Sequence, residues 1–189
     1  MTRSGCAALL MLLLVAAGGA TAQRRIDPGD EPSLRADEGL VAVVFDTNYP
    51  VMSAKFRKVG NALAAPPLRL AANGRTMELY AATAGDYEWE RILIPQAKGA
   101  RAYYDLAGEQ DYRFKVRAGR INYAGDLEFR PGALRRASIR LVNRSLPVLD
   151  WLRKDHRATF DRYESAYSGE FPDPFPEFYD VGGEYRRNM

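Results

Sequence analysis

Hydrophobic and polar side chains alternate along residues 110–129, with an interruption at Gly119. Alternation with a period of two predicts a β-hairpin that has one buried face and one solvated face. Gly119 suits the first position of a type II′ turn, because that position requires a positive φ. Such a turn would place Arg113 opposite Asp126 as a cross-strand ion pair. The face predicted to be solvated carries Arg113, Lys115, Arg117, Asn122, Asp126 and Glu128.

The remaining strands follow from similar patterns. A second alternating region predicts another hairpin, with arms at residues 75–83 and 87–94. The continuous apolar run at residues 40–45 predicts a strand that is buried on both faces. Turns are expected at Tyr49-Pro50 and Asn73-Gly74. Further strands are predicted at 54–59, 68–72, 102–105 and 134–143. About seven short strands separated by turns are typical of a single antiparallel β-sandwich, so the chain is predicted to be mainly β.

The period changes after Ser145, which is a suitable N-cap residue for a helix. Apolar positions now recur at steps of three or four, which predicts one C-terminal amphipathic helix at residues 146–165. The predicted apolar stripe contains Leu149, Leu152, His156, Phe160 and Tyr163.

Residues 171–179 combine proline with aromatic side chains, and proline at this density prevents a regular helix. We expect this tail to fold back over the helix or over a sheet edge, because burying a Phe side chain stabilises a protein by about 1.5–3 kcal/mol. The alternative is that the tail binds a partner, since proline-rich extended segments dock in aromatic grooves. The candidate partner-binding residues are Phe171, Phe175, Phe178 and Tyr179.

The N-terminus has the features of a secretory signal peptide. Arg3 precedes an apolar run at residues 7–17, and Ala20-Thr21-Ala22 matches the small-residue cleavage motif. We therefore expect cleavage near Ala22 and export to the periplasm or beyond. The apolar run is too short to span a membrane well, so no membrane span is expected in the mature chain.

These patterns divide the chain into five segments. The segments are a signal peptide at residues 1–22, a flexible leader at 23–38, a β-sandwich domain at 39–144, a C-terminal helix at 145–168 and an extended tail at 169–189.

Cysteine content and charge narrow the range of partners. Cys6 is the only cysteine and lies within the expected signal peptide, so the mature chain is expected to lack disulfides. The chain has 27 basic and 24 acidic side chains, and loss of Arg3 leaves 26 against 24, a net charge of +2. A balance this close to neutral, together with export, argues against nucleic acid as a partner.

Few residues of the chain are candidates for catalysis. His156 is the only histidine, and its two interpretations are a general base or metal ligand, and a side chain packed on the apolar stripe. We expect packing, because the partners of a catalytic triad or a zinc site are absent. Glu88 and Glu90 share one strand face, and a pair of carboxylates is the requirement of one class of hydrolase, but alternation favours a solvated sheet face. No catalytic residue, metal ligand or cofactor is predicted.

The motif Y-x-F-x-V-x-x-G-x-I-N-Y-x-G-D-L at residues 112–127 resembles a hairpin of uncharacterised secreted proteins and lipoproteins of Gram-negative bacteria. The resemblance implies a small β-sandwich of the immunoglobulin-like or transthyretin-like kind, and it implies no activity. Lipoprotein members of this group carry a cysteine at the cleavage site, and this chain does not.

The sequence therefore predicts an exported β-sandwich protein that acts as a non-catalytic binding or accessory module of the cell envelope. Its partner would be an envelope protein or ligand. Two alternatives are a small carboxylate-dependent hydrolase and a structural component of the envelope.

Overall fold

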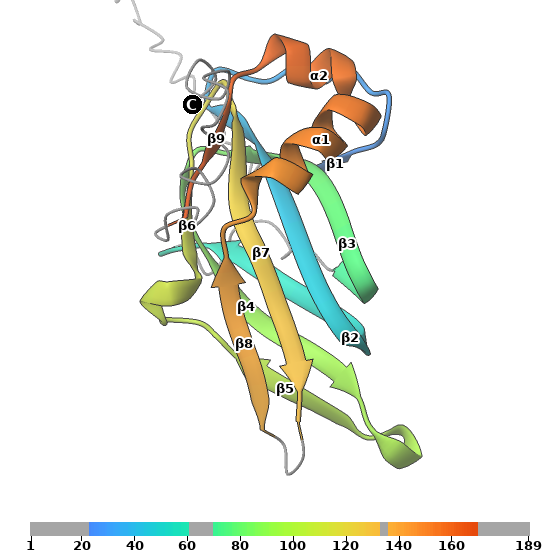
Figure 1. Ribbon diagram of the computed structural model, residues 1–189. Helices are drawn as coiled ribbons and strands as arrows, with labels where there is room; N and C mark the ends of the chain where they lie inside the picture. Colours follow the sequence, from blue (N-terminus) through green and yellow to red (C-terminus); the bar gives the residue numbers. More distant parts are fainter. Residues whose placement is uncertain (1–22, 61–69, 133–135, 170–189) are drawn as a thin grey trace, which may run out of the picture.

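The computed structural model describes residues 23–60, 70–132 and 136–169 as a curled β-sheet that carries two helices (Figure 1). The strands are β1 Arg24–Ile26, β2 Glu38–Lys58, β3 Leu70–Thr83, β4 Gly85–Pro95, β5 Arg101–Asp105, β6 Arg113–Val116, β7 Ile121–Pro131, β8 Ala137–Val142 and β9 Ser165–Tyr167. The helices are α1 Ser145–Asp155 and α2 Arg157–Arg162, and short 3₁₀ turns lie at Ala97–Gly99 and Gln110–Tyr112. The prediction of a mainly β protein is confirmed.

Strand β2 is the centre of the sheet. Its first part pairs with β3 in antiparallel orientation and with β7 in parallel orientation, and its last part pairs with β4. Leu40 to Phe45 are completely buried, which confirms the strand predicted from the apolar run. The neighbouring main chains protect the backbone of this segment, and its side chains fill a core on each face.

Two of the expected turns are irregularities within strands. The pairing of β2 with β3 shifts between Thr47 and Val51, so the Tyr49-Pro50 pair lies within a bulged part of β2. The Thr47 hydroxyl donates to the Tyr49 carbonyl and accepts from the Tyr49 N–H, which satisfies backbone groups at the bulge. Gly74 of β3 has a φ of 88° and lies opposite Thr47 of β2. The predictions of turns at Tyr49-Pro50 and Asn73-Gly74 are therefore wrong.

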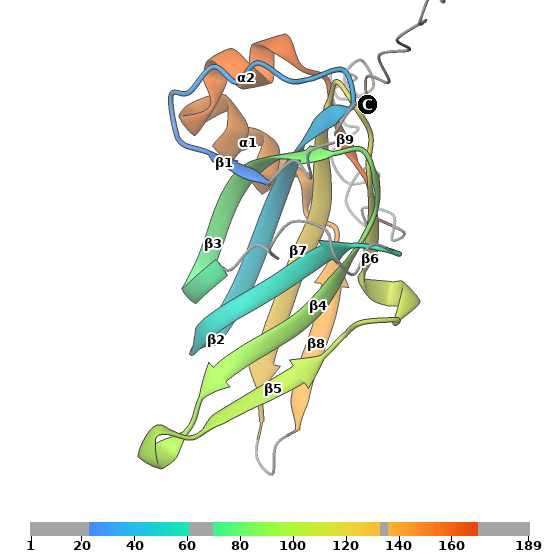
Figure 2. The same ribbon diagram turned by 180° about the vertical axis from the view of Figure 1, so that it is seen from behind.

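The larger core lies inside the curl of the sheet, between the row β3, β2, β7 and β8 and the strands β4, β5 and β6 (Figures 1 and 2). Phe56, from the last part of β2, is completely buried at its centre. Its ring meets the edges or faces of four other aromatic rings, at centroid distances between 5.4 and 6.3 Å. These rings belong to Tyr80, Tyr87, Trp89 and Phe114. Aromatic packing of this kind joins β2, β3, β4 and β6 without any covalent link.

The hairpin predicted at residues 110–129 is wrong, although both of its strands exist. Strand β6 pairs with β4, and β7 pairs with β2, β8 and β9. The chain after α2 lies between the two predicted arms: the Lys115 N–H donates to the Ser168 carbonyl at 3.0 Å, and the Ser168 N–H donates to the Tyr123 carbonyl at 2.9 Å. Gly119 does have the expected positive φ, 70°.

The second predicted hairpin also has the right strands and the wrong pairing. Strand β3 pairs with β1 and β2, whereas β4 pairs with β2, β5 and β6. The chain passes at Ala84 from one side of the curl to the other, so β3 and β4 follow each other in sequence but do not pair (Figure 2). The prediction of an all-antiparallel arrangement is wrong as well, because β2 with β7 and β7 with β9 are parallel.

A second, smaller core lies on the outer face of the sheet under α1 (Figure 1). Val148 and Leu152 of α1 cover apolar side chains of β2, β3 and β7. The predicted single helix is interrupted at His156, whose φ of −128° and ψ of 41° are not helical. Ser145 is the first helical residue rather than the N-cap, and Arg144 occupies the cap position without a side-chain cap bond.

The segment expected to be a flexible leader is part of this outer layer. Ile26 of β1 is buried in the smaller core. The Asp30 carbonyl accepts a hydrogen bond from the Thr159 hydroxyl, and the Pro32 carbonyl accepts one from the Tyr163 hydroxyl. Backbone carbonyls of this segment thus accept hydrogen bonds from α2 and from Tyr163, the residue that follows it.

A bulge in β7 reverses the direction of its side chains. Tyr123 lies opposite Ala42 and Asp126 lies opposite Val44, so two β7 residues oppose the single residue Val43. Gly125 adopts a φ of 91° at this point. Ahead of the bulge Tyr123 contacts the outer core, and beyond it Leu127 contacts the inner core. The bulge therefore sends Asp126 to the outer face of the sheet.

The predicted signal peptide at residues 1–22 and the candidate binding residues Phe171, Phe175, Phe178 and Tyr179 lie outside the described residues. Within the described part of the chain, neither helix has the length and apolar character needed to cross a bilayer.

We predict that Gly125→Ala destabilises the protein more than Gly119→Ala. Both residues have a positive φ, which costs an alanine about 1 kcal/mol. An added Cβ at Gly125 would also lie 3.0 Å from Leu141 Cγ, whereas nothing lies within 4 Å of one at Gly119. Urea denaturation should show at least about 1 kcal/mol of additional loss for Gly125→Ala. Equal losses would mean that Leu141 moves without cost.

Candidate functional site

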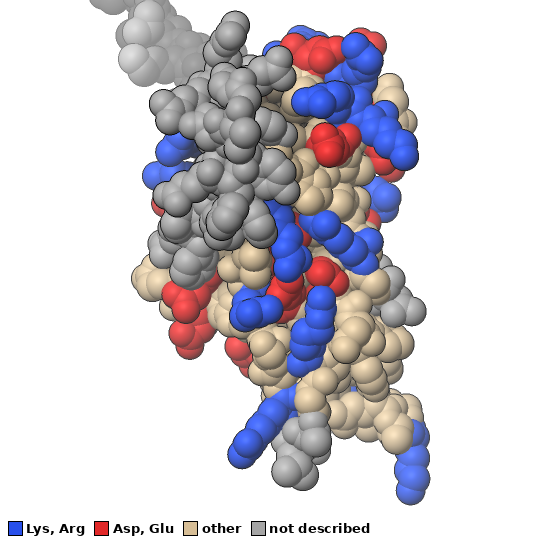
Figure 3. Space-filling model, in the orientation of Figure 1, with Lys and Arg blue, Asp and Glu red and all other residues tan. Residues whose placement is uncertain are grey.

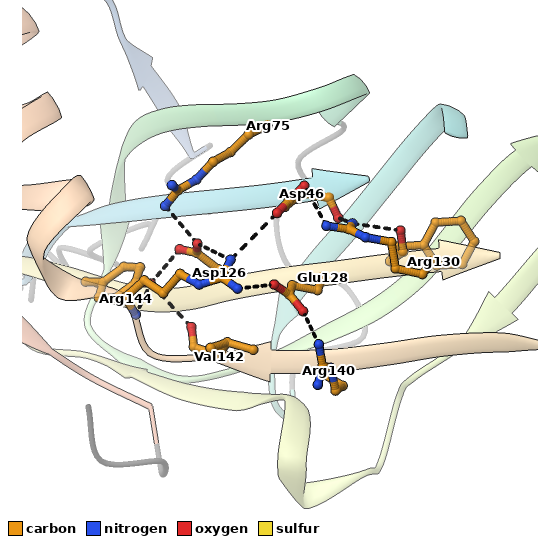
Figure 4. A network of polar contacts seen from close by, with 10 residues as sticks. Asp46, Arg75, Asp126, Glu128, Arg130, Arg140, Val142 and Arg144 are labelled. Carbon is orange, nitrogen blue, oxygen red and sulfur yellow. Dashed lines mark hydrogen bonds and ion pairs between the residues drawn. The ribbon is translucent and has the colours of Figure 1, made fainter. Parts of the chain in front are cut away.

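Three carboxylates lie among arginines on the outer face of the sheet, next to the core under α1 (Figure 4). Asp46 is the residue that follows the buried run of β2, and Asp126 and Glu128 follow the bulge of β7. Asp126 is completely buried and Glu128 is 4% exposed. Buried carboxylates require compensating partners, because burial removes their hydration.

Asp126 has a partner at each oxygen. Its Oδ2 lies 2.8 Å from Nη2 of Arg75 and 3.7 Å from Nη1 of Arg144. Its Oδ1 accepts a 2.5 Å hydrogen bond from the Tyr123 hydroxyl. Burial raises the pKa of Asp126, and the Tyr123 hydrogen bond and the two arginines counteract that rise only in part. Burial and the charge of Asp126 also raise the pKa of Tyr123, so this hydroxyl keeps its proton and remains a donor.

Arg144 connects the three carboxylates. Its Nη2 lies 2.5 Å from Glu128 Oε1, and its Nη1 lies 3.7 Å from both Asp46 Oδ2 and Asp126 Oδ2. Its backbone N–H donates to the Tyr123 hydroxyl oxygen at 3.0 Å. Arg144 is the second of the two residues between β8 and α1, so the network fixes the point at which the sheet ends and the helix begins.

Two further arginines complete the network. Nη2 of Arg140 lies 2.7 Å from Glu128 Oε2. Arg130 donates to the Asp46 carbonyl at 2.7 Å and lies 3.0 Å from Asp46 Oδ1. Four arginines therefore surround three carboxylates, which leaves the network with one net positive charge.

The carboxylates lie beneath the arginines, which remain partly accessible to solvent. Side-chain exposure is 30% for Arg75, 33% for Arg144, 37% for Arg130 and 68% for Arg140. Exposed Arg136 directly precedes β8, and strand alternation places it on the same side as Arg140. We call these five arginines the arginine face: Arg75, Arg130, Arg136, Arg140 and Arg144. The space-filling view from this side shows basic side chains around a few acidic ones (Figure 3).

This arrangement is suited to binding anions. A guanidinium group has five N–H donors in a planar fork that matches the oxygens of carboxylate, sulfate or phosphate. Each arginine of the network uses one or two of its three side-chain nitrogens in these contacts, so N–H donors of the partly exposed side chains remain available. The carboxylates themselves serve to hold the arginines in place.

Several charged residues that the sequence analysis discussed do not lie where it expected them. Asp126 and Glu128 were expected on a solvated face, which is wrong, because the bulge and the arginines bury them. Arg113 does not pair with Asp126; its Nε lies 3.7 Å from Glu88. Glu88 is itself buried and bonded to Arg57 at 3.0 Å, so its expected solvated position is also wrong. Glu90 is only partly exposed.

His156 lies at the break between the two helices and is 2% exposed. Its ring contacts that of Trp151 edge to face, at a centroid distance of 5.0 Å. Its Nδ1 has no hydrogen-bond partner among the described residues. Burial lowers the pKa of His156, and the charges of Asp155, Asp30 and Asp27 oppose this shift. Among the residues that the structure describes, no group of three or more His, Cys, Asp and Glu is placed to hold a metal ion.

The arginine face was missed because its members are dispersed in the sequence. The run Asp126-Leu127-Glu128-Phe129-Arg130 does place charged residues at every second position, and therefore on one strand face, which was a usable signal. Arg75 and Arg144 reach the same carboxylate from 51 and 18 positions away along the chain, and no spacing rule connects them.

Comparison of the chain with protein-family models, curated proteins and solved structures finds no match.

We predict that Arg144→Met destabilises the protein by about 2–3 kcal/mol, because it removes a partner from buried carboxylates. Arg140→Met is the matched control. It breaks a single pair at a largely exposed side chain and should cost about 0–1 kcal/mol. Urea denaturation of the two variants measures the difference. Similar small losses for both would show that Arg75 and Arg140 suffice to neutralise the buried acids.

We predict that His156 destabilises the fold in acid. The folded-state pKa is lowered, so the unfolded chain binds a proton more readily, and stability falls as the pH decreases through the ordinary value of 6.5. The free energy of unfolding of the parent should therefore decline relative to that of His156→Gln between pH 7.5 and pH 5. Above pH 7.5 the difference between the two proteins should be constant. A constant difference over the whole range would contradict the prediction.

Proposed function

We propose that this protein is an exported, non-catalytic binding module of the cell envelope, and that the arginine face is its binding surface. The observation that carries the proposal is the arrangement of this face, in which buried carboxylates hold partly exposed arginines in a fixed array. Export is the expectation from the N-terminal sequence. The resemblance to secreted β-sandwich proteins supports it, and we propose that the curled sheet is an elaborated member of that class.

The geometry favours binding over hydrolysis. A carboxylate-dependent hydrolase needs one carboxyl group that gives a proton to its substrate and a second that acts as base or nucleophile. Asp126 is buried beneath Arg75 and bonded to Tyr123, and Glu128 is held by two arginines. Proton transfer requires hydrogen-bond reach to the substrate, and these two buried carboxylates lie beneath the arginines that hold them.

The same geometry favours binding over a purely structural role. Arg75, Arg130 and Arg144 carry three positive charges, which would suffice to compensate the three carboxylates within the fold. Arg136 and Arg140 add positive charge at the exposed margin of the same face. Surplus positive charge on an ordered face attracts anions and raises their association rate.

Cell fractionation tests this function. The double variant Arg136→Gln/Arg140→Gln removes two exposed charges from the arginine face, and Arg153→Gln/Arg157→Gln removes two exposed charges from the helices. We expect the parent and the helix variant to sediment with the envelope fraction, and the arginine-face variant to move into the soluble fraction. Equal retention of all three proteins, or no retention of the parent, would contradict the proposal.

A further inference from the structure

The arrangement of the arginines indicates what kind of anion would fit them. Arg75 and Arg144 contact the same oxygen of Asp126 at 2.8 and 3.7 Å, so their contacting nitrogens are separated by at most the sum of the two distances, 6.5 Å. Arg140 and Arg144 contact different oxygens of Glu128, and Arg130 and Arg144 contact different oxygens of Asp46. Arg144 is thus the centre, and the other three arginines lie around it (Figure 4).

The carboxylates keep these guanidinium groups apart. Each acid lies between two arginines, so the positive charges are spread over β3, β7 and β8 and do not converge on one point. A small anion would contact only part of such an array. A ligand that carries several anionic groups along its length would contact more of it at once.

The carboxylates also prepare the arginines for binding. A free arginine side chain loses rotamer freedom when it binds a ligand, and this loss weakens binding. Here the ion pairs to Asp46, Asp126 and Glu128 fix much of each side chain beforehand. The N–H groups that remain can form paired hydrogen bonds to carboxylate or sulfate oxygens.

The surroundings of the arginine face argue against a membrane or a protein as its ligand. Protein interfaces depend on apolar and aromatic anchors, and membrane-surface segments insert apolar side chains. The large hydrophobic side chains exposed in the described part of the chain are Tyr49, Met52 and Tyr103. They belong to β2 and β5 and not to the arginine face. A hydrophilic ligand needs no such anchor.

From these observations we infer that the arginine face binds a linear acidic polysaccharide through its carboxylate or sulfate groups. This inference rests on the proposed binding function and specifies its ligand class. The polysaccharide lies across β3, β7 and β8, with Arg144 central and Arg136 and Arg140 at the exposed margin.

Isothermal titration calorimetry of the purified protein tests the ligand class. The probes are polygalacturonate, which carries carboxylates, and dextran sulfate, with uncharged dextran as the matched control. We expect binding to both acidic polymers, weakening with added salt, and no binding to dextran. Arg136→Gln/Arg140→Gln should weaken binding about tenfold, whereas Arg153→Gln/Arg157→Gln, with the same change in net charge, should change it less than about twofold.

Further measurements separate the alternatives. Equal weakening by the two double variants would overturn the inference, because it would show that binding depends on the net charge of the protein and not on the arginine face. Tighter binding to phosphatidylglycerol vesicles or to polyglutamate than to either polysaccharide would also overturn it. Arginine-dependent retention in the envelope without polysaccharide binding would reject the ligand class and leave the proposed function standing.

Arg140→Lys provides a second variant that preserves charge. Lysine lacks the planar fork, so this variant should weaken binding to polygalacturonate several-fold if paired hydrogen bonds are formed. Thermal unfolding of each variant shows whether it folds as the parent does. Unchanged binding by a folded Arg140→Lys protein would contradict direct recognition by this guanidinium group.

Discussion

The burial of β2 on both of its faces is the constraint on which the other elements depend. Residues 40–45 have no accessible surface, and their side chains alternate between the inner core and the outer core. Strands β3 and β7 must pair with its two edges, β4 to β6 must close the inner core, and α1 must cover the outer one. Beyond residues 40–45, β2 continues through a bulge, and its last part pairs with β4 and adds Phe56 to the inner core.

The outer face is only partly covered by α1, and the arginine face lies where that cover ends. Beyond Val44 in β2 and beyond the bulge in β7, the positions that would extend the outer core carry Asp46, Asp126 and Glu128. These acids are neutralised by arginines from β3, β7, β8 and the start of α1. Ion pairing thus replaces apolar packing on the same sheet face, and it leaves arginine N–H groups available at the surface. Ion pairs of this kind contribute little net stability compared with apolar packing, which is consistent with a role in binding.

The C-terminal segment shows how the topology is completed. Strand β9 pairs with β7, and Ser168, which follows it, bonds to both β6 and β7. Without this segment the backbone groups of Lys115 and Tyr123 would lack these partners. The two helices and the N-terminal segment around Asp30 and Pro32 position β9, so the ends of the described chain depend on each other.

The local structure of the chain could be predicted from its sequence alone. Alternation identified the strands now seen as β3 to β8, and the apolar run identified the buried part of β2. A positive φ was correctly expected at Gly119. These features follow from the side-chain period and from backbone sterics, which act over a few residues. Strand pairing could not be predicted in this way, because the side-chain period fixes the faces of a strand but not its partner. The tertiary structure also decided that Gly125 forms a bulge and that the helical pattern breaks at His156. The arginine face belongs to the same category, since Arg75, Asp126 and Arg144 meet only once the sheet has curled.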